Sequence, residues 1–81
     1  MSTYCVQYAD GARDALMKMA RSQRDLFEAQ IARVAMDPYR YGIPLAGNRD
    51  RREDMIAGAV TVFWLSAGVL TVSVVRTLQT G

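Results

Sequence analysis

Hydrophobic and polar positions are distributed unevenly along this chain, and the longest apolar stretch lies near its end. Residues 55–75 carry no charged side chain, a run long enough to cross a bilayer as one helix. We interpret it instead as two buried strands, because Val, Ile and Thr are abundant in it and favour a pleated sheet. In its middle, Ser66-Ala67-Gly68 suits a tight turn in which the glycine supplies a positive φ. The pattern therefore predicts a β-hairpin with strands at Ala59–Leu65 and Val69–Leu78.

Two segments in the first half of the chain have apolar residues at helical spacing. The first predicted helix follows Asp10 as its cap and ends at Ala20-Arg21; the second starts at Ser22 with a capping-box-like sequence and ends near Met36. Pro38 enforces that end, because it disfavours helical angles at the residue before it. Two helices joined by so few residues form an α-hairpin. We expect its buried stripe to contain Leu16, Met19, Leu26, Phe27, Ile31 and Val34.

The remaining segments complete a sheet. Polar and apolar residues alternate over Thr3–Ala9, which predicts a short first strand. Pro, Gly and Asn break every periodicity in residues 37–48, which predicts a loop, and a strand at Arg51–Ala57 follows, with Gly58 at the next turn. We therefore predict one α+β domain over residues 1–81. It has an N-terminal strand, an α-hairpin and a three-strand antiparallel meander, with both helices packed on one face of the sheet.

The amino-acid composition limits the kinds of functional site that the protein can have. Hydrophobic residues make up 51% of the 81 residues, enough for a packed core, and the net charge is only +2. Nine of the ten basic residues are Arg, whose planar fork suits phosphate groups and guanine edges. The chain has no His, which excludes a Ser-His-Asp triad and removes the commonest metal ligand. We therefore predict no metal and no cofactor.

The single cysteine and the N-terminus bear on the compartment. One Cys cannot form an internal disulfide, which suits a reducing cytosol, and we expect Cys5 to be a small buried side chain. The first ten residues lack the basic and then apolar segments of a signal peptide. We therefore predict a cytoplasmic protein with no membrane contact.

The order of these segments resembles the RelE/ParE toxin superfamily of bacterial toxin–antitoxin systems. The resemblance covers nearly the whole chain. It rests on the strand YCVQYAD, the Asp37-Pro38 pair, the Leu45-x-Gly47 loop, the basic strand start Arg51-Arg52, and the strands VTVFW and VLTVSVVR. It implies an α-hairpin on a small sheet and a partner antitoxin. Many members cleave mRNA on the ribosome, and one branch inhibits DNA gyrase.

The resemblance also implies a site. In RNA cleavage the 2′-hydroxyl attacks the neighbouring phosphate. Such a site needs a proton acceptor, cations for the phosphorane and a proton donor for the leaving 5′-oxygen. We expect the catalytic residues, with Glu53 as the base, to be Arg51, Arg52, Glu53 and Arg76. We expect the RNA-binding residues to be Tyr39, Arg40, Tyr41 and Arg49.

The same residues allow other interpretations. Where active members often carry a Tyr, this chain has Phe63 or Trp64, which favours a non-catalytic relative that binds an antitoxin or inhibits gyrase by protein contact. Positive and negative charges are interleaved at 49–54 and can form a self-neutralising, solvated loop, which Tyr39 and Tyr41 can pack down. In each case we expect partners, because so apolar a small domain exposes an interface. These are a cognate antitoxin, the ribosome and mRNA for an active toxin, and further copies of the chain.

Overall fold

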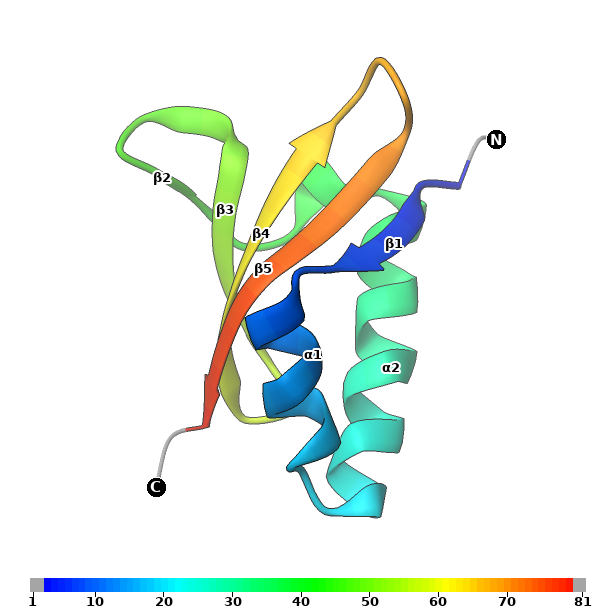
Figure 1. Ribbon diagram of the computed structural model, residues 1–81. Helices are drawn as coiled ribbons and strands as arrows, with labels where there is room; N and C mark the ends of the chain where they lie inside the picture. Colours follow the sequence, from blue (N-terminus) through cyan, green and yellow to red (C-terminus); the bar gives the residue numbers. More distant parts are fainter. Residues whose placement is uncertain (1–2, 80–81) are drawn as a thin grey trace.

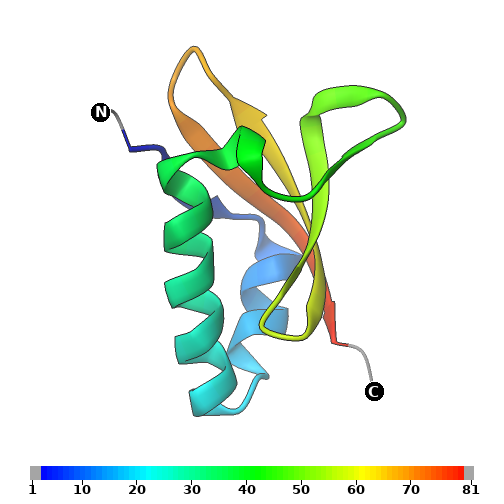
Figure 2. The same ribbon diagram turned by 180° about the vertical axis from the view of Figure 1, so that it is seen from behind.

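Two helices and five strands make up the protein in the computed structural model, which describes residues 3–79. Figure 1 and Figure 2 show both helices side by side on one side of a twisted sheet, which confirms the predicted α+β class and α-hairpin. In chain order the elements are β1 (Cys5–Tyr8), α1 (Asp10–Met17), α2 (Arg21–Met36), the short 3₁₀ helix η1 (Pro38–Arg40), β2 (Ile43–Leu45), β3 (Asn48–Ile56), β4 (Ala59–Ser66) and β5 (Thr71–Gln79).

The sheet is mixed. Its strand order is β1-β5-β4-β3-β2, with β1 parallel to β5 and the other neighbours antiparallel. The predicted meander corresponds to β3, β4 and β5, and β1 joins its free edge. The two helices separate β1 from the meander in sequence, which gives the chain enough length to return in the parallel direction.

The predicted loop at 37–48 holds more structure than its composition indicated. It contains η1 and β2, and β3 begins at Asn48 instead of Arg51. Between β2 and β3, Ala46 and Gly47 have φ values of 50° and 74°. Two positive φ angles are typical of a type I′ turn, whose twist matches that of paired strands. A second Ala-Gly pair, Ala57-Gly58, joins β3 to β4 with φ values of 51° and 79°.

The long apolar run forms the predicted hairpin. Strands β4 and β5 pair from Ser66 with Thr71 to Ala59 with Gln79. Val72 and Val74, two residues apart on the same face of β5, are both 0% exposed. The turn differs from the prediction, because Leu70 takes the positive φ, at 48°, and Gly68 does not. No helix within residues 3–79 is both long and apolar enough to cross a bilayer.

The core lies between the helices and the inner face of the sheet. Five of the six predicted stripe residues are at most 6% exposed, whereas Leu26 is 50% exposed. The five are Leu16, Met19, Phe27, Ile31 and Val34. They form one cluster with side chains of the inner face, among them Ile56, Phe63, Leu65, Val72 and Val74.

The helix starts differ from the prediction. The N-caps are Ala9 for α1 and Ala20 for α2, and neither makes a side-chain hydrogen bond. Asp10 is the first residue of α1, where its charge favours the positive end of the helix dipole. Ser22 lies inside α2 and does not cap it, so the predicted capping box is wrong. The end of α2 at Met36 is as predicted.

Two glutamines of α2 fix the turn between β3 and β4. The Gln23 Nε2 donates to the Ala57 carbonyl at 3.0 Å, and the Ala57 N–H donates to Gln30 Oε1 at 2.7 Å. Side chains of α2 therefore bind both the backbone N–H and the backbone carbonyl of Ala57. This anchors the β3–β4 hairpin on the helical layer, so its other face is presented outward.

Candidate functional site

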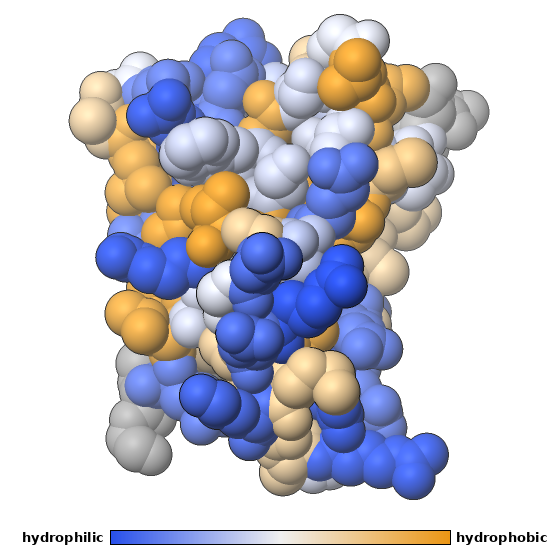
Figure 3. Space-filling model, in the orientation of Figure 1, coloured by the Kyte–Doolittle hydropathy of each residue, from blue (hydrophilic) through white to orange (hydrophobic). Residues whose placement is uncertain are grey.

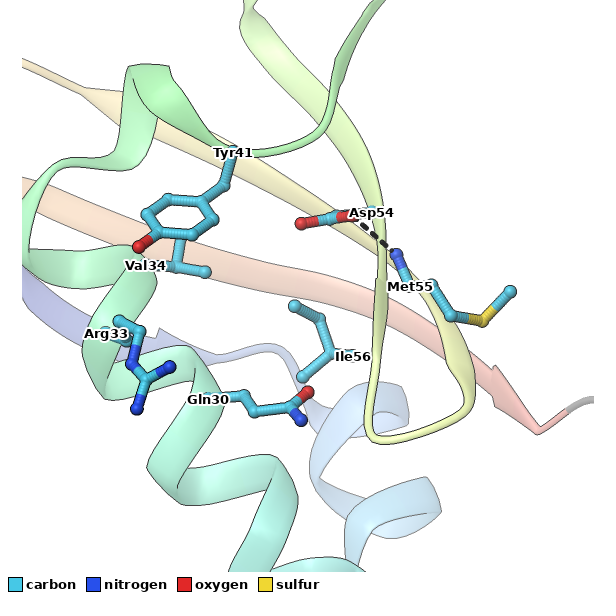
Figure 4. Close-up of a pocket in the computed structure, with 7 residues that line it drawn as sticks. All are labelled: Gln30, Arg33, Val34, Tyr41, Asp54, Met55 and Ile56. Carbon is cyan, nitrogen blue, oxygen red and sulfur yellow. Dashed lines mark hydrogen bonds between the residues drawn. The ribbon is translucent and has the colours of Figure 1, made fainter.

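The face of the sheet that looks away from the helices, here called the open face, carries charged side chains from β3. Ile56 is 2% exposed and Met55 is 55% exposed. Figure 4 shows the two side chains pointing apart, Ile56 towards α2 and Met55 away from it. Because side chains alternate along a strand, Arg51 and Glu53 lie on the same face as Met55.

Strand pairing arranges the open face in three cross-strand rows. They are the aromatic row (Arg51, Trp64, Ser73, Gln7), the charged row (Glu53, Val62, Arg76) and the apolar row (Met55, Val60, Leu78). Three of the four predicted catalytic residues fall in the aromatic and charged rows, and Glu53 and Arg76 flank Val62. Figure 3 shows hydrophobic side chains gathered on the left of the molecule, over the strands of Figure 1, while hydrophilic ones cover α1.

A β-bulge aims Arg76 at the open face. Val62 pairs with Arg76 but Phe63 pairs with Val74, so Val75 is an extra residue on β5. Regular alternation from the buried Val74 would point Arg76 into the core, and the extra residue reverses this. Arg76 is accordingly exposed, whereas the following Thr77 is 4% exposed.

The aromatic row contains a stacked pair. The guanidinium carbon of Arg51 lies 4.4 Å from the centre of the Trp64 ring, within the range of a cation–π interaction. Trp64 is 45% exposed beside Phe63, which is 0% exposed. From the sequence, either Phe63 or Trp64 could stand in place of a Tyr on the site. Their adjacent positions on β4 put them on opposite faces, and the structure places Trp64 on the open face.

Arg52 lies on the helix side of β3, apart from the other predicted catalytic residues. It is 7% exposed. Its Nε donates to the carbonyl of Tyr41 at 2.8 Å, Nη1 to that of Arg49 at 3.1 Å and Nη2 to that of Gly42 at 3.2 Å. A Cβ on Gly42 would lie 2.6 Å from the Glu53 carbonyl oxygen, which shows how closely the chain before β2 approaches β3. The Arg52 fork therefore ties this segment down.

Two of the predicted RNA-binding residues lie together where η1 meets the first residues of β3. The Tyr39 hydroxyl donates to Asp50 Oδ1 at 2.6 Å, and the guanidinium carbon of Arg49 lies 4.5 Å from the Tyr39 ring centre. The hydrogen bond to Asp50, and then burial, raise the pKa of Tyr39 above its usual value. Tyr39 also packs against the core cluster. These contacts agree with the interpretation that Tyr39 packs its segment down.

The other two, Arg40 and Tyr41, lie on the helix side. With residues at the end of α2 they line a cavity of about 410 Å³. Tyr41 and Arg33 also line a neighbouring pocket of about 190 Å³ between α2 and β3. Figure 4 shows the Tyr41 ring beside Val34, with Asp54 directed towards it from β3. Arg40 and Tyr41 are therefore not brought together with the three charged residues of the open face.

The donor set gives no support for a metal centre. Among the described residues, no group of three or more His, Cys, Asp or Glu side chains could hold an ion. Cys5 is exposed, against our expectation of a buried thiol. It shares the outward parity of Gln7 on β1, while Val6 and Tyr8 pack against the core.

Comparison with known proteins identifies the fold. No family model and no curated protein matches the chain. Solved structures do match it: a chain of the RelBE2 toxin–antitoxin complex from Mycobacterium tuberculosis has a TM-score of 0.82 at 18% identity, covering 98% of this chain and 100% of that one. The isolated E. coli RelE toxin has a TM-score of 0.79 at 16% identity, covering 96% of this chain and 85% of that one. The chain has the RelE fold. A chain of the RelE–RelB complex from the archaeon Pyrococcus horikoshii also matches, with a TM-score of 0.80 at 14% identity over 99% of this chain and 98% of that one.

Proposed function

We propose that this protein is the toxin of a toxin–antitoxin pair and inhibits translation by cleaving mRNA on the ribosome. The RelE fold supports this, since the matching structures are those of RelE toxins and RelBE complexes. The observation that carries the chemistry is the gathering of Arg51, Glu53 and Arg76 on one open face of the sheet. Arg76 reaches that face only through the bulge at Val75, and bulges of this kind often re-aim a side chain beside an active site.

Each of the three side chains has a role in the proposed cleavage. The Glu53 carboxylate takes the proton of an RNA 2′-hydroxyl, whose oxygen attacks the adjacent phosphorus. The bond from phosphorus to the 5′-oxygen breaks, leaving a 2′,3′-cyclic phosphate. The 5′-oxygen takes a proton from water, and the resulting hydroxide takes the proton from Glu53, which restores the carboxylate. Arg51 and Arg76 bind the phosphate oxygens on which negative charge develops. Because the chain has no His to serve as a proton donor, we expect slow cleavage.

A second candidate is a toxin that acts by protein contact, with gyrase as the target, or a relative that only binds an antitoxin. The apolar row favours it. Met55 and Leu78 are 55% and 54% exposed on the open face, and Ile43 at its edge is 65% exposed. Exposed apolar side chains gathered in this way mark protein interfaces. In the first proposal the same surface is available to the antitoxin or to a second copy of the chain.

Controlled expression in bacteria tests the proposal. Growth, protein synthesis and mRNA 5′-ends are followed after induction of the wild type and of an Arg51→Ala/Arg76→Ala variant. An Arg13→Ala/Arg21→Ala variant is the matched control, because it removes two exposed guanidinium groups from the helices. We expect growth arrest and new mRNA ends with the wild type and with the control variant, but not with Arg51→Ala/Arg76→Ala. Each lost Arg–phosphate contact should slow cleavage about 10²–10³-fold.

The other outcomes separate the candidates. Growth arrest without new mRNA ends moves the protein to the second candidate. Cleavage that persists in the open-face variant shows that the site lies elsewhere. Absence of any growth defect contradicts a toxin, and relief of arrest by the product of an adjacent reading frame identifies the antitoxin.

A further inference from the structure

We propose that Trp64, together with Arg51 stacked on it, is a platform for a base of single-stranded RNA. This rests on the proposed function and adds to it a binding residue that positions the substrate beside the charged row. Aromatic side chains on sheet surfaces bind unpaired bases by stacking, with Arg guanidinium planes adding to the stack. The open face presents this combination at one place.

The exposure of Trp64 is the first observation. Its chain neighbours Phe63 and Leu65 are 0% and 6% exposed, whereas Trp64 is 45% exposed even with the Arg51 guanidinium 4.4 Å from its ring centre. A large ring is thus held outward by the alternation of a strand whose other side is anchored in the core. A ring fixed in this way loses little further freedom when a flat ligand stacks on it.

The surroundings of the ring are the second observation. Its cross-strand neighbour on β5 is Ser73, and Gln7 on β1 continues the row. Ser66, two residues further along β4, is exposed. These short or polar side chains leave the ring uncovered on the β5 side and offer hydroxyl and amide groups to the edge of a base. A base on Trp64 also places its phosphates near Arg51 and near Arg76 in the adjacent row, about 7 Å along the strand.

The same arrangement favours RNA over a protein ligand for this ring. A protein hot spot typically lies in a well-packed pocket that is fully desolvated in the complex. The apolar row lies beyond the charged row, so Trp64 sits among Arg, Ser and Gln side chains instead. Cations beside an exposed ring match a ligand that is flat and anionic.

Because Trp64 is the single tryptophan of the chain, its fluorescence reports on the platform directly. The purified protein is titrated with single-stranded RNA carrying 2′-O-methyl groups, which binds but cannot be cleaved. We expect quenching that saturates with RNA, and no quenching with an abasic strand of equal length. Binding of a dye-labelled strand is measured in parallel by anisotropy, so that variants lacking the tryptophan can be compared.

Expected effects differ between variants. Trp64→Ala should weaken RNA binding about 5- to 150-fold with an unchanged salt dependence, as loss of one stacked base predicts. Trp64→Phe should retain most of the affinity. Arg51→Ala should lower the slope of log Kd against log salt by about 0.7, because one phosphate contact is lost. Met55→Ala, which removes an exposed apolar side chain from the same face, should leave the affinity unchanged.

Each contrary result overturns the platform. RNA that binds without quenching the fluorescence shows that the ring is not used. The same follows if Trp64→Ala binds RNA as tightly as the wild type while its unfolding midpoint is unchanged. In both cases the toxin proposal is still tested separately by mRNA cleavage. Quenching by an antitoxin peptide but not by RNA assigns the ring to a protein interface. Loss of the proposed function is read separately, as absence of growth arrest and of new mRNA ends.

Discussion

Replacing Arg52 with Ala should unfold the protein far more readily than replacing any exposed arginine. The side chain is 7% exposed, and each of its three donor nitrogens binds a backbone carbonyl of a residue earlier in the chain. Two of these carbonyls, of Tyr41 and Gly42, precede β2, and the third, of Arg49, lies in β3. One guanidinium group therefore holds the start of the β2–β3 hairpin closed.

The magnitude follows from these contacts. A hydrogen bond from a charged donor contributes about 1.5–3 kcal/mol, and a buried group left unsatisfied costs about 1–3 kcal/mol. The three carbonyls lie in partly exposed segments, where water replaces part of what is lost, so we expect about 2–4 kcal/mol in total rather than three full contributions. Small domains have about 5–15 kcal/mol of stability, so this loss is severe. Arg52→Lys keeps the charge but not the planar set of donors, so its unfolding free energy should lie between those of the wild type and Arg52→Ala.

Urea unfolding followed by far-UV circular dichroism measures the effect. Arg49→Ala serves as the control, because Arg49 is exposed and its cation–π contact with Tyr39 is worth about 0.5–1 kcal/mol. A loss below about 1 kcal/mol for Arg52→Ala would refute the argument that the three hydrogen bonds close the hairpin. If the three hydrogen bonds do close the hairpin, loss of activity in an Arg52 variant reports on folding and does not identify a catalytic group.

Three further predictions test the fold. Phe27→Ala should cost about 3–5 kcal/mol in urea unfolding, because Phe27 is 0% exposed, whereas Leu26→Ala, at a side chain 50% exposed, should cost less than about 1 kcal/mol. Ala46→Asn should stabilise the protein by about 0.5 kcal/mol and raise Tm by about 2–4 °C, since Asn tolerates the φ of 50° better than Ala; a lower Tm would contradict the type I′ turn. The Asp50 hydrogen bond raises the pKa of Tyr39, so its contribution is present below the ordinary pKa of 10.0 and is lost as pH rises through the folded-state value. Tyr39→Phe should therefore flatten the fall in unfolding free energy above pH 10.0, and identical pH profiles would exclude this coupling.

The elements with strong periodicity could be predicted from the sequence, and those that depend on turn chemistry could not. The 3.6-residue stripe placed Phe27, Ile31 and Val34 in the core, and the β-branched run gave the β4–β5 hairpin. Strand β2 was missed because three residues with a central Pro44 carry no alternation. Its pairing depends on the Ala46-Gly47 turn. Ala rarely adopts a left-handed conformation, so its presence in the sequence does not indicate such a turn.

The candidate site shows the same division. Alternation along β3 separates Arg51 and Glu53 from Arg52, which two-residue periodicity alone could have predicted once the strand was placed. The hydrogen bonds of Arg52 could not be predicted, because two of its three carbonyl partners, Tyr41 and Gly42, lie in the irregular segment before β2.

Arg76 is the residue whose position depends most on tertiary structure. Counting from Val72 and Val74, a regular strand turns Arg76 inward, where a lone guanidinium among Phe63 and Val72 would be costly. The bulge resolves this by shifting Arg76 outward and giving the inner position to Thr77, whose hydroxyl pairs with that of Thr61 at 3.1 Å. The chain therefore gains a satisfied inner face and an outward cation from the same extra residue. A charge at an inward-facing position is therefore accommodated in two ways in this sheet: three hydrogen bonds hold Arg52 inward on β3, whereas a bulge turns Arg76 outward on β5 and so assembles the charged row.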